Sequence, residues 1–306
     1  EWAAKLGLPR ETVVAVGAFD AHMGAVGGGI SRNHLLKVMG TSTCDIVVAP
    51  RGEQPERLVS GICGQVDGSV IPGMIGYEAG QSAFGDVYAW FKKLLSWPLE
   101  SVLPKLDGIA DDVKQTIVAR VGEQIIPALE AAATAVSAEE SVPLALDWMN
   151  GRRTPDANQR LAGAIAGIRL GTDAPRVYRS LVEATAFGSR AIVERFRAQG
   201  IRIDGAIAIG GVAQKSRFVM QTVADVLNME VTVAAGDQPV ALGAAMFAAT
   251  AAAVYGQIED AQRAMSPGAE TVYRPDAARA QRYDRLYQDY LALGSFVENH
   301  LTRADS

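Results

Sequence analysis

The order of apolar segments in the last third of the chain limits the fold more than any other sequence feature. A β-rich run at 203–211 is followed by an amphipathic run at 214–228, a second β-rich run at 230–235 and an Ala-rich run at 240–255. This order predicts strand, helix, strand and helix. Parallel neighbours in a sheet need such crossovers, so the segment predicts βαβ units and parallel strand pairs. The predicted fold class is α/β.

The first part of the chain has a different pattern. Short β-rich runs between Gly, Asp and Asn turns predict a β-meander from Thr12 to Val70, interrupted by a short helix at 20–27. A period near 3.6 then predicts helices from Ser82 to Val136, outside the sheet. Further predicted elements are a strand at 164–170, a core-facing helix at 174–199 and a helix at 275–299. Without internal repeats or low-complexity linkers, one α/β domain with a helical addition at about 82–150 is expected.

Composition excludes several classes of protein. The 306 residues are 49% hydrophobic and 21% charged, as in an ordinary globular protein. The net charge is −5 and no Lys/Arg run exceeds a pair, so we expect no nucleic-acid partner. We expect no leader peptide, no membrane partner and a cytoplasmic location, because the longest apolar run is too short to span a bilayer. Cys44 and Cys63 lack metal-ligand spacing and predict buried thiols in a reducing compartment.

One carboxylate stands among five glycines at residues 16–29, directly after an apolar run that predicts a strand. If residues 20–27 are helical, Gly24 and Gly27 lie on the helix face that carries Asp20. A carboxylate beside bare backbone could accommodate a large ligand. The alternative is that Asp20 only caps the helix. The segment by itself supports both interpretations equally.

Two glycine-bearing turns could bind phosphate or a nucleotide. Gly40, Thr41 and Ser42 join two β-rich runs, and a tight turn of this kind offers N–H and hydroxyl groups to phosphate oxygens. Gly210 and Gly211 end a predicted strand before a helix, at the usual ligand edge of an α/β sheet. A bare hairpin and a plain βα turn are the alternatives. The Walker and Rossmann phosphate-binding motifs are absent.

Other candidate residues have weaker support. Gly243 follows Pro239 in an Ala-rich segment, which favours close helix packing over ligand binding. Glu78 and Gln81 lie at a strand-to-helix junction, where they could bind substrate hydroxyls or cap the helix. The three histidines are scattered, so neither a metal site nor a Ser-His-Asp arrangement is expected.

Taken in order, these features resemble the C-terminal half of the FGGY carbohydrate kinases, which have the actin-like (ribonuclease H-like) ATPase fold of actin, hexokinase and Hsp70. The likeness extends from about Thr12 to about Tyr290. The motifs GAFDAHMGAVG, VMGTSTCD and GYEAGQSAFGDVYAW are most similar to the family members that phosphorylate L-ribulose. A second family signature is visible at 163–168 and 177–183, and it departs from the family at Arg176, where His, Asp, Glu or an amide is usual.

The resemblance implies an activity and a set of roles. It implies ATP-dependent conversion of L-ribulose to L-ribulose 5-phosphate, as in arabinose catabolism, with Mg²⁺ held mainly through phosphates and water. Asp20 aligns with the catalytic base and would also contact the sugar. The residues implied for ATP binding are Gly40, Thr41, Ser42, Gly210, Gly211, Lys215, Ser216 and Gly243. Glu78 and Gln81 would bind the ketose.

The resemblance also accounts for the first residues of the chain. The opening EWAAKLGLPRE lacks Met and predicts the end of a helix, with Gly7 at its C-cap. Family members have a second actin-like domain before this one, and nothing in the chain matches it. We therefore expect that domain and a sugar to be partners of this chain, and we expect the isolated chain to be inactive.

The sequence leaves three alternatives open. The kinase could act on another ketose or polyol, such as D-ribulose or xylulose. An isolated actin-like half could instead be a non-catalytic nucleotide-binding or assembly module. The Tyr-bearing face of the last predicted helix could pack on the chain's own core or form the interface of a homodimer.

Overall fold

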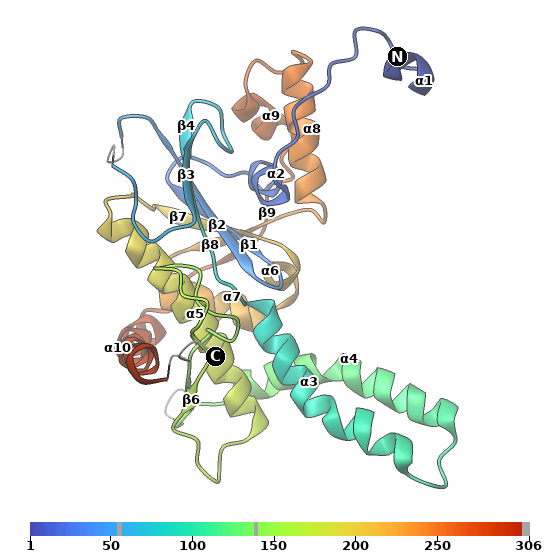
Figure 1. Ribbon diagram of the computed structural model, residues 1–306, viewed down its shortest axis with the longest axis vertical. Helices are drawn as coiled ribbons and strands as arrows, with labels where there is room; N and C mark the ends of the chain where they lie inside the picture. Colours follow the sequence, from blue (N-terminus) through green and yellow to red (C-terminus); the bar gives the residue numbers. More distant parts are fainter. Residues whose placement is uncertain (54–56, 138–139, 302–306) are drawn as a thin grey trace.

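The computed structural model describes residues 1–53, 57–137 and 140–301. Its centre is a seven-stranded mixed sheet (Figure 1). The strands are His34–Met39 (β1), Thr43–Pro50 (β2), Gly64–Asp67 (β3), Met74–Ala79 (β4), Gly205–Ile209 (β7), Val231–Ala234 (β8) and Ala269–Tyr273 (β9). Their order across the sheet is β3-β4-β2-β1-β7-β8-β9. Leu144–Ala145 (β5) and Ile165–Ala166 (β6) form a separate two-stranded sheet.

The strand directions confirm the predicted fold class. β1 pairs in parallel with β7, and β7 pairs in parallel with β8. The connection between β7 and β8 passes through Gly211–Lys215 (α6) and Arg217–Leu227 (α7), which is the predicted βαβ crossover. β1, β2, β4 and β3 pair antiparallel, as a meander does.

Helices cover both faces of the sheet (Figure 1). Asp20–Gly27 (α2), Pro239–Ala251 (α8) and Ile258–Met265 (α9) pack on one face. Ala174–Ala198 (α5), α7 and Ala277–His300 (α10) pack on the other. Alternating strand residues separate the two cores, since Leu35 belongs to one and Leu36 to the other. The predicted helices at 20–27 and 174–199 are confirmed.

The last helix packs on the chain itself. Tyr283, Tyr287 and Tyr290 of α10 are buried, and their rings contact Phe187 of α5. The Tyr-bearing face therefore belongs to the core. Gly85–Ser101 (α3) and Asp111–Ala135 (α4), joined by the short 3-10 helix Leu103–Lys105 (η1), form a helical pair that projects from the body (Figure 1).

Three predicted elements differ from the structure. The run at 12–16 is not a strand, because it pairs with no described strand, and Val14 and Val16 are 88% and 91% exposed. Only Ile165 and Ala166 of the predicted strand at 164–170 pair with another strand. The predicted helix at 214–228 is divided at Ser216, whose side chain accepts the Val219 N–H at 3.1 Å and caps α7.

Trp2–Leu6 (α1) ends at Gly7 in the left-handed conformation, which confirms the predicted C-cap. Both cysteines are free, but Cys63 is exposed and Cys44 is only partly buried, so the predicted burial of Cys63 is wrong. Among the described residues, no helix combines the length and apolar character needed to cross a bilayer.

Candidate active site

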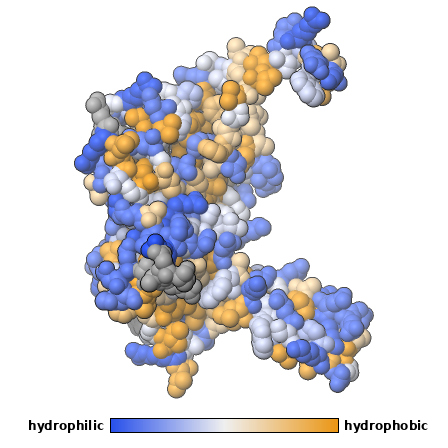
Figure 2. Space-filling view, in the orientation of Figure 1, coloured by the Kyte–Doolittle hydropathy of each residue, from blue (hydrophilic) through white to orange (hydrophobic). Residues whose placement is uncertain are grey.

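A cleft of about 750 Å³ lies between the end of the sheet and the helical pair α3–α4. Figure 2 shows the surface hollowed between this pair and the body. Five residues predicted to bind ATP line it: Gly40, Thr41, Gly211, Lys215 and Ser216. The two glycine-bearing turns, which lie far apart in the sequence, therefore open onto one cleft.

Backbone contacts fix the β1–β2 turn against its neighbours. Gly210 has a φ of 100°, and a Cβ there would lie 2.6 Å from the carbonyl oxygen of Met39, so only glycine fits. The carbonyl of Gly40 accepts the N–H of Gly85 at 3.0 Å. The carbonyl of Thr41 accepts the N–H of Phe84 at 2.7 Å. The turn is thus held between the end of β7 and the start of α3.

Lys215 and Gly211 face the cleft with free groups. A Cβ on Gly211 would meet no atom within 4 Å, so its backbone is open to a ligand. Lys215 is exposed, and its ammonium makes no hydrogen bond or ion pair with any residue in the described ranges. The hydroxyl of Ser216, in contrast, donates to Glu130 and accepts the Val219 N–H. The Ser216 side chain is therefore already engaged within the protein.

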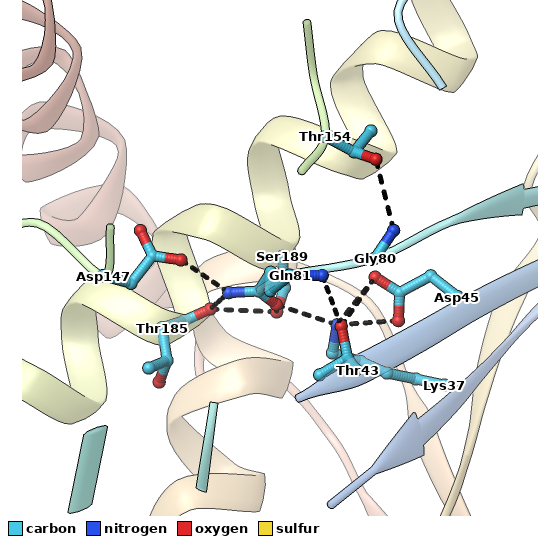
Figure 3. A network of polar contacts seen from close by, with 9 residues as sticks. All are labelled: Lys37, Thr43, Asp45, Gly80, Gln81, Asp147, Thr154, Thr185 and Ser189. Carbon is cyan, nitrogen blue, oxygen red and sulfur yellow. Dashed lines mark hydrogen bonds and ion pairs between the residues drawn. The ribbon is translucent and has the colours of Figure 1, made fainter. Parts of the chain in front are cut away.

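A buried polar network lies beneath the turn (Figure 3). Lys37 and Asp45 face each other across β1 and β2 and are only 3% and 0% exposed. The Lys37 ammonium donates to both Asp45 carboxylate oxygens, at 2.8 and 2.9 Å, and to Gln81 Oε1 at 3.0 Å. Buried charges need such partners, because an unpaired one is costly in a low-dielectric interior.

Gln81 is the centre of this network (Figure 3). Its Nε2 donates to Asp147 Oδ2 at 2.8 Å and to the Thr185 carbonyl at 2.9 Å, while its Oε1 also accepts from the Ser189 hydroxyl. Burial raises the pKa of the Asp147 carboxyl. The sequence interpretation made Gln81 a sugar contact, but its side chain is buried and fully hydrogen-bonded inside the protein.

Asp20 is the first residue of α2, and Phe19 is the N-cap. The exposed carboxylate of Asp20 accepts the N–H of Ala21 at 2.8 Å. One turn later, a Cβ on Gly24 would lie 3.0 Å from Ile209 Cδ1, at the end of β7. The start of α2 is therefore near the sheet edge from which Gly210 emerges, although Asp20 is not among the residues that line the cleft.

The other glycines of α2 have a packing role. A Cβ on Gly27 would lie 1.9 Å from the Pro239 carbonyl oxygen, and one on Gly243 would lie 1.9 Å from that of Met23. The two helices therefore touch through backbone, and α8 occupies the face of α2 that one of the two sequence interpretations left open for a large ligand. Gly243 lies at this crossing and not in the cleft, in agreement with the packing interpretation.

Glu78 lies on β4, on the side of the sheet that α2 covers. His22 Nε2 is 3.2 Å from Glu78 Oε2. Hydrogen bonding from His22 holds the pKa of the Glu78 carboxyl below its usual value, with a smaller contribution from the nearby Cys44 thiol. Sequence analysis gave neither His22 nor Cys44 a role, because their proximity to Glu78 depends on the fold.

Lys37 and Asp45 were also missed, although the sequence holds a signal for them. Each lies four residues from Thr41, so a hairpin centred on that turn places them opposite each other. Lys in an otherwise apolar strand, facing Asp in the next, predicts a cross-strand ion pair.

The fold is the actin-like ATPase fold found in the FGGY sugar kinases, and comparison with known proteins establishes the family. The C-terminal domain of the FGGY family of carbohydrate kinases matches residues 35–252, and the chain belongs to this family. The crystal structure of a xylulose kinase from Rhodospirillum rubrum aligns with a TM-score of 0.77 and 27% identity, over 98% of this chain and 55% of that one.

The two relatives described next, found by sequence comparison, are both ribulokinases. A ribulokinase from Vibrio parahaemolyticus is 46% identical over 301 residues, covering 97% of this chain and 52% of the relative. A ribulokinase from Shouchella clausii is 39% identical over 301 residues, covering 97% of this chain and 50% of the relative. The chain thus spans about half the length of the curated relatives that it matches.

Proposed function

We propose that this chain is the nucleotide-binding, base-bearing half of a kinase that converts L-ribulose and ATP to L-ribulose 5-phosphate and ADP. The observation that carries the proposal is the meeting of the Gly40 and Gly211 turns in one cleft beside Lys215, whose ammonium has no partner in the described part of the chain. The likeness to ribulokinases supports the choice of sugar. The other half of the cleft would come from the family's N-terminal domain.

The cleft suits a nucleotide in size and chemistry. Its volume of about 750 Å³ lies within the usual range for small-molecule sites. Ile126, Pro127 and Val212 offer apolar surface to a base, whereas Gly40 and Thr41 offer polar groups to phosphates. Mg²⁺ would be held mainly through phosphates and water, which matches its reluctance to lose water ligands. A cytoplasmic location, where free thiols stay reduced, is part of the proposal.

The acceptor hydroxyl would be activated by Asp20. In phosphoryl transfer with a loose transition state, a carboxylate contributes mainly by orienting the nucleophile and accepting its proton. Glu78 would bind hydroxyls of the same sugar. Gln81 and Ser216 would act as supports, because their side chains are engaged within the protein. Ser42 and Gly210 would shape the phosphate-binding turns, and Gly243 would position α2.

Substituting Asp20→Asn in the full-length protein tests this role. We expect turnover to fall by about 10²- to 10⁴-fold, the usual contribution of a general base, with ADP affinity nearly unchanged. Asp107→Asn changes an exposed acid between α3 and α4 and provides the control. Turnover that survives Asp20→Asn would leave this residue with only its contact to the Ala21 amide.

One alternative acceptor has a specific observation behind it. The structural likeness to a xylulose kinase makes xylulose the alternative acceptor. A panel of L-ribulose, D-ribulose and xylulose, compared by kcat/KM on the full-length protein, separates the choices. A preference for xylulose would contradict the proposed substrate, and nucleotide binding without turnover of any sugar would favour a non-catalytic module.

A further inference from the structure

The surroundings of Glu78 form a small polar group on the face of the sheet opposite to the buried Lys37 network. Glu78 pairs with Ile46 across β4 and β2, and Cys44 lies two residues before Ile46. Because side chains two residues apart share a face, Cys44 and Glu78 point to the same side of the sheet. That side is covered by α2, which contributes His22. Asp45, one residue further, points to the opposite side and joins Lys37.

The carboxylate of Glu78 is held on one side and open on the other. His22 Nε2 is 3.2 Å from Oε2, and the His22 side chain is 15% exposed against 38% for Glu78. The ring of Phe19 meets the His22 ring edge-on, with centroids 5.5 Å apart, which restrains the imidazole. The partial exposure of Glu78 leaves room for contact with a ligand.

We propose that His22 and Cys44 are positioning residues that fix the Glu78 carboxylate for recognition of a polyhydroxylated acceptor sugar. The proposal rests on the proposed function and deepens it. A carboxylate already fixed in one rotamer loses less conformational entropy when it binds hydroxyls. Because His22 is two residues after Asp20, its contact with Glu78 also holds the candidate base near the candidate sugar-binding residue.

A purely structural role explains the contact less well. α2 is already attached to the sheet through Ala25 and Val26, which are fully buried. Its glycines also pack tightly on α8. A partly exposed polar contact of this kind adds little stability to such a helix. We therefore expect His22→Ala to leave the denaturation midpoint nearly unchanged and to alter sugar recognition instead.

The contact itself can be tested on the 306-residue chain without any activity. The protein has three histidines, so their ring signals can be resolved by NMR. Glu78→Gln is expected to shift the ring signals of His22 and leave those of His34 and His300 in place. Unmoved His22 signals would overturn the proposal even if the kinase assignment holds.

The role in recognition is tested by kinetics of the full-length protein. For His22→Ala we expect the KM for the acceptor sugar to rise about tenfold, as the loss of preorganisation predicts, with the KM for ATP unchanged. His22→Gln keeps a donor and should recover part of the loss, and Cys44→Ala should show a smaller effect than His22→Ala. His34→Ala, at the amino end of β1, is the control. Equal changes in both KM values, or none for the sugar, would overturn the proposal.

A pH profile gives an independent readout. Because His22 holds the pKa of Glu78 down, His22→Ala should raise it and move the acid limb of kcat/KM for the sugar to higher pH. Two other groups act on the pKa of Glu78, namely the Cys44 thiol and the Arg153 guanidinium. The Glu78 carboxylate in turn raises the pKa of the Cys63 thiol. An unmoved acid limb contradicts the positioning role. Absence of turnover with any sugar, together with the NMR shift, would instead reject the proposed function, and with it the role in sugar recognition, while the contact between His22 and Glu78 would stand.

Discussion

Lys215 is the cation that we expect to contact nucleotide phosphates in the cleft. It is exposed and has no partner among the described residues, so binding would not have to break an existing ion pair. Lys215→Ala should weaken ADP binding by about 1–2 kcal/mol, roughly tenfold, as for a charge-assisted hydrogen bond near the surface. Calorimetric titration of the chain measures this. Lys93→Ala, on the exposed side of α3, is the matched control, and equal affinities would contradict the role.

For single residues, the sequence did not predict whether a side chain points into the cleft or into the protein. Gln81 and Ser216 both lie in motifs that indicate ligand contact, yet both side chains are used inside the protein. Lys215, adjacent to Ser216, instead faces the cleft. A linear motif locates such residues within a segment, but burial and hydrogen-bond partners come from segments distant in sequence. His22 shows the same limit, since its partner is 56 positions away.

The β1–β2 hairpin depends on the buried pair of Lys37 and Asp45. Lys37→Met removes the cation and leaves the Asp45 carboxylate in a dry environment, which should lower the free energy of unfolding by about 3–5 kcal/mol. The double variant Lys37→Met/Asp45→Leu removes both charges and should recover most of that loss. Urea denaturation of the three proteins measures the difference. Equal destabilisation of single and double variants would show that the network as a whole, and not the unpaired charge, sets the cost.

The crossing of α2 and α8 gives a second prediction at the level of elements. Gly243→Ala places a Cβ 1.9 Å from the Met23 carbonyl oxygen, so the helices must move apart, at a cost of about 1–3 kcal/mol or more. Gly122→Ala on α4 meets no atom within 4 Å and should instead stabilise by about 0.5–1 kcal/mol through helix propensity. Denaturation curves compare the two. A neutral Gly243→Ala would contradict the tight crossing.

Elements with a long, uniform pattern were predictable, and short or divided ones were not. α5 carries an apolar face over seven turns and was predicted nearly to its ends. The βαβ order from β7 to α8 was predicted for the same reason. The run at 12–16 has strand-like composition but lacks a neighbouring strand, which composition cannot report. The break at Ser216 depends on a cap that interrupts an otherwise continuous amphipathic pattern.

At the scale of the whole molecule, the sheet separates two clusters of polar residues that lie on opposite faces near the same edge. Lys37, Asp45 and Gln81 support the β1–β2 turn from below, and His22 with Cys44 holds Glu78 on the face under α2. The cleft itself is open, with α3–α4 on one side. Val14, Val16 and Phe19 stand exposed just before α2. These features, together with the coverage of about half of each relative, are what we expect if the chain is one half of the proposed kinase.

The last prediction concerns the chain by itself. We expect the purified 306-residue protein to bind ADP in the cleft, because the two turns and Lys215 are present and preformed. We expect no phosphorylation of ribulose, because catalysis of phosphoryl transfer needs a closed site that excludes water and completes the set of contacts.

A coupled assay for ADP release, with and without ribulose, measures turnover, and titration calorimetry measures binding. Adding the N-terminal half in the same polypeptide should restore turnover. Ribulose-dependent ADP release by the isolated chain would refute the two-half mechanism, and failure to bind ADP would remove the basis for placing the nucleotide between the Gly40 and Gly211 turns.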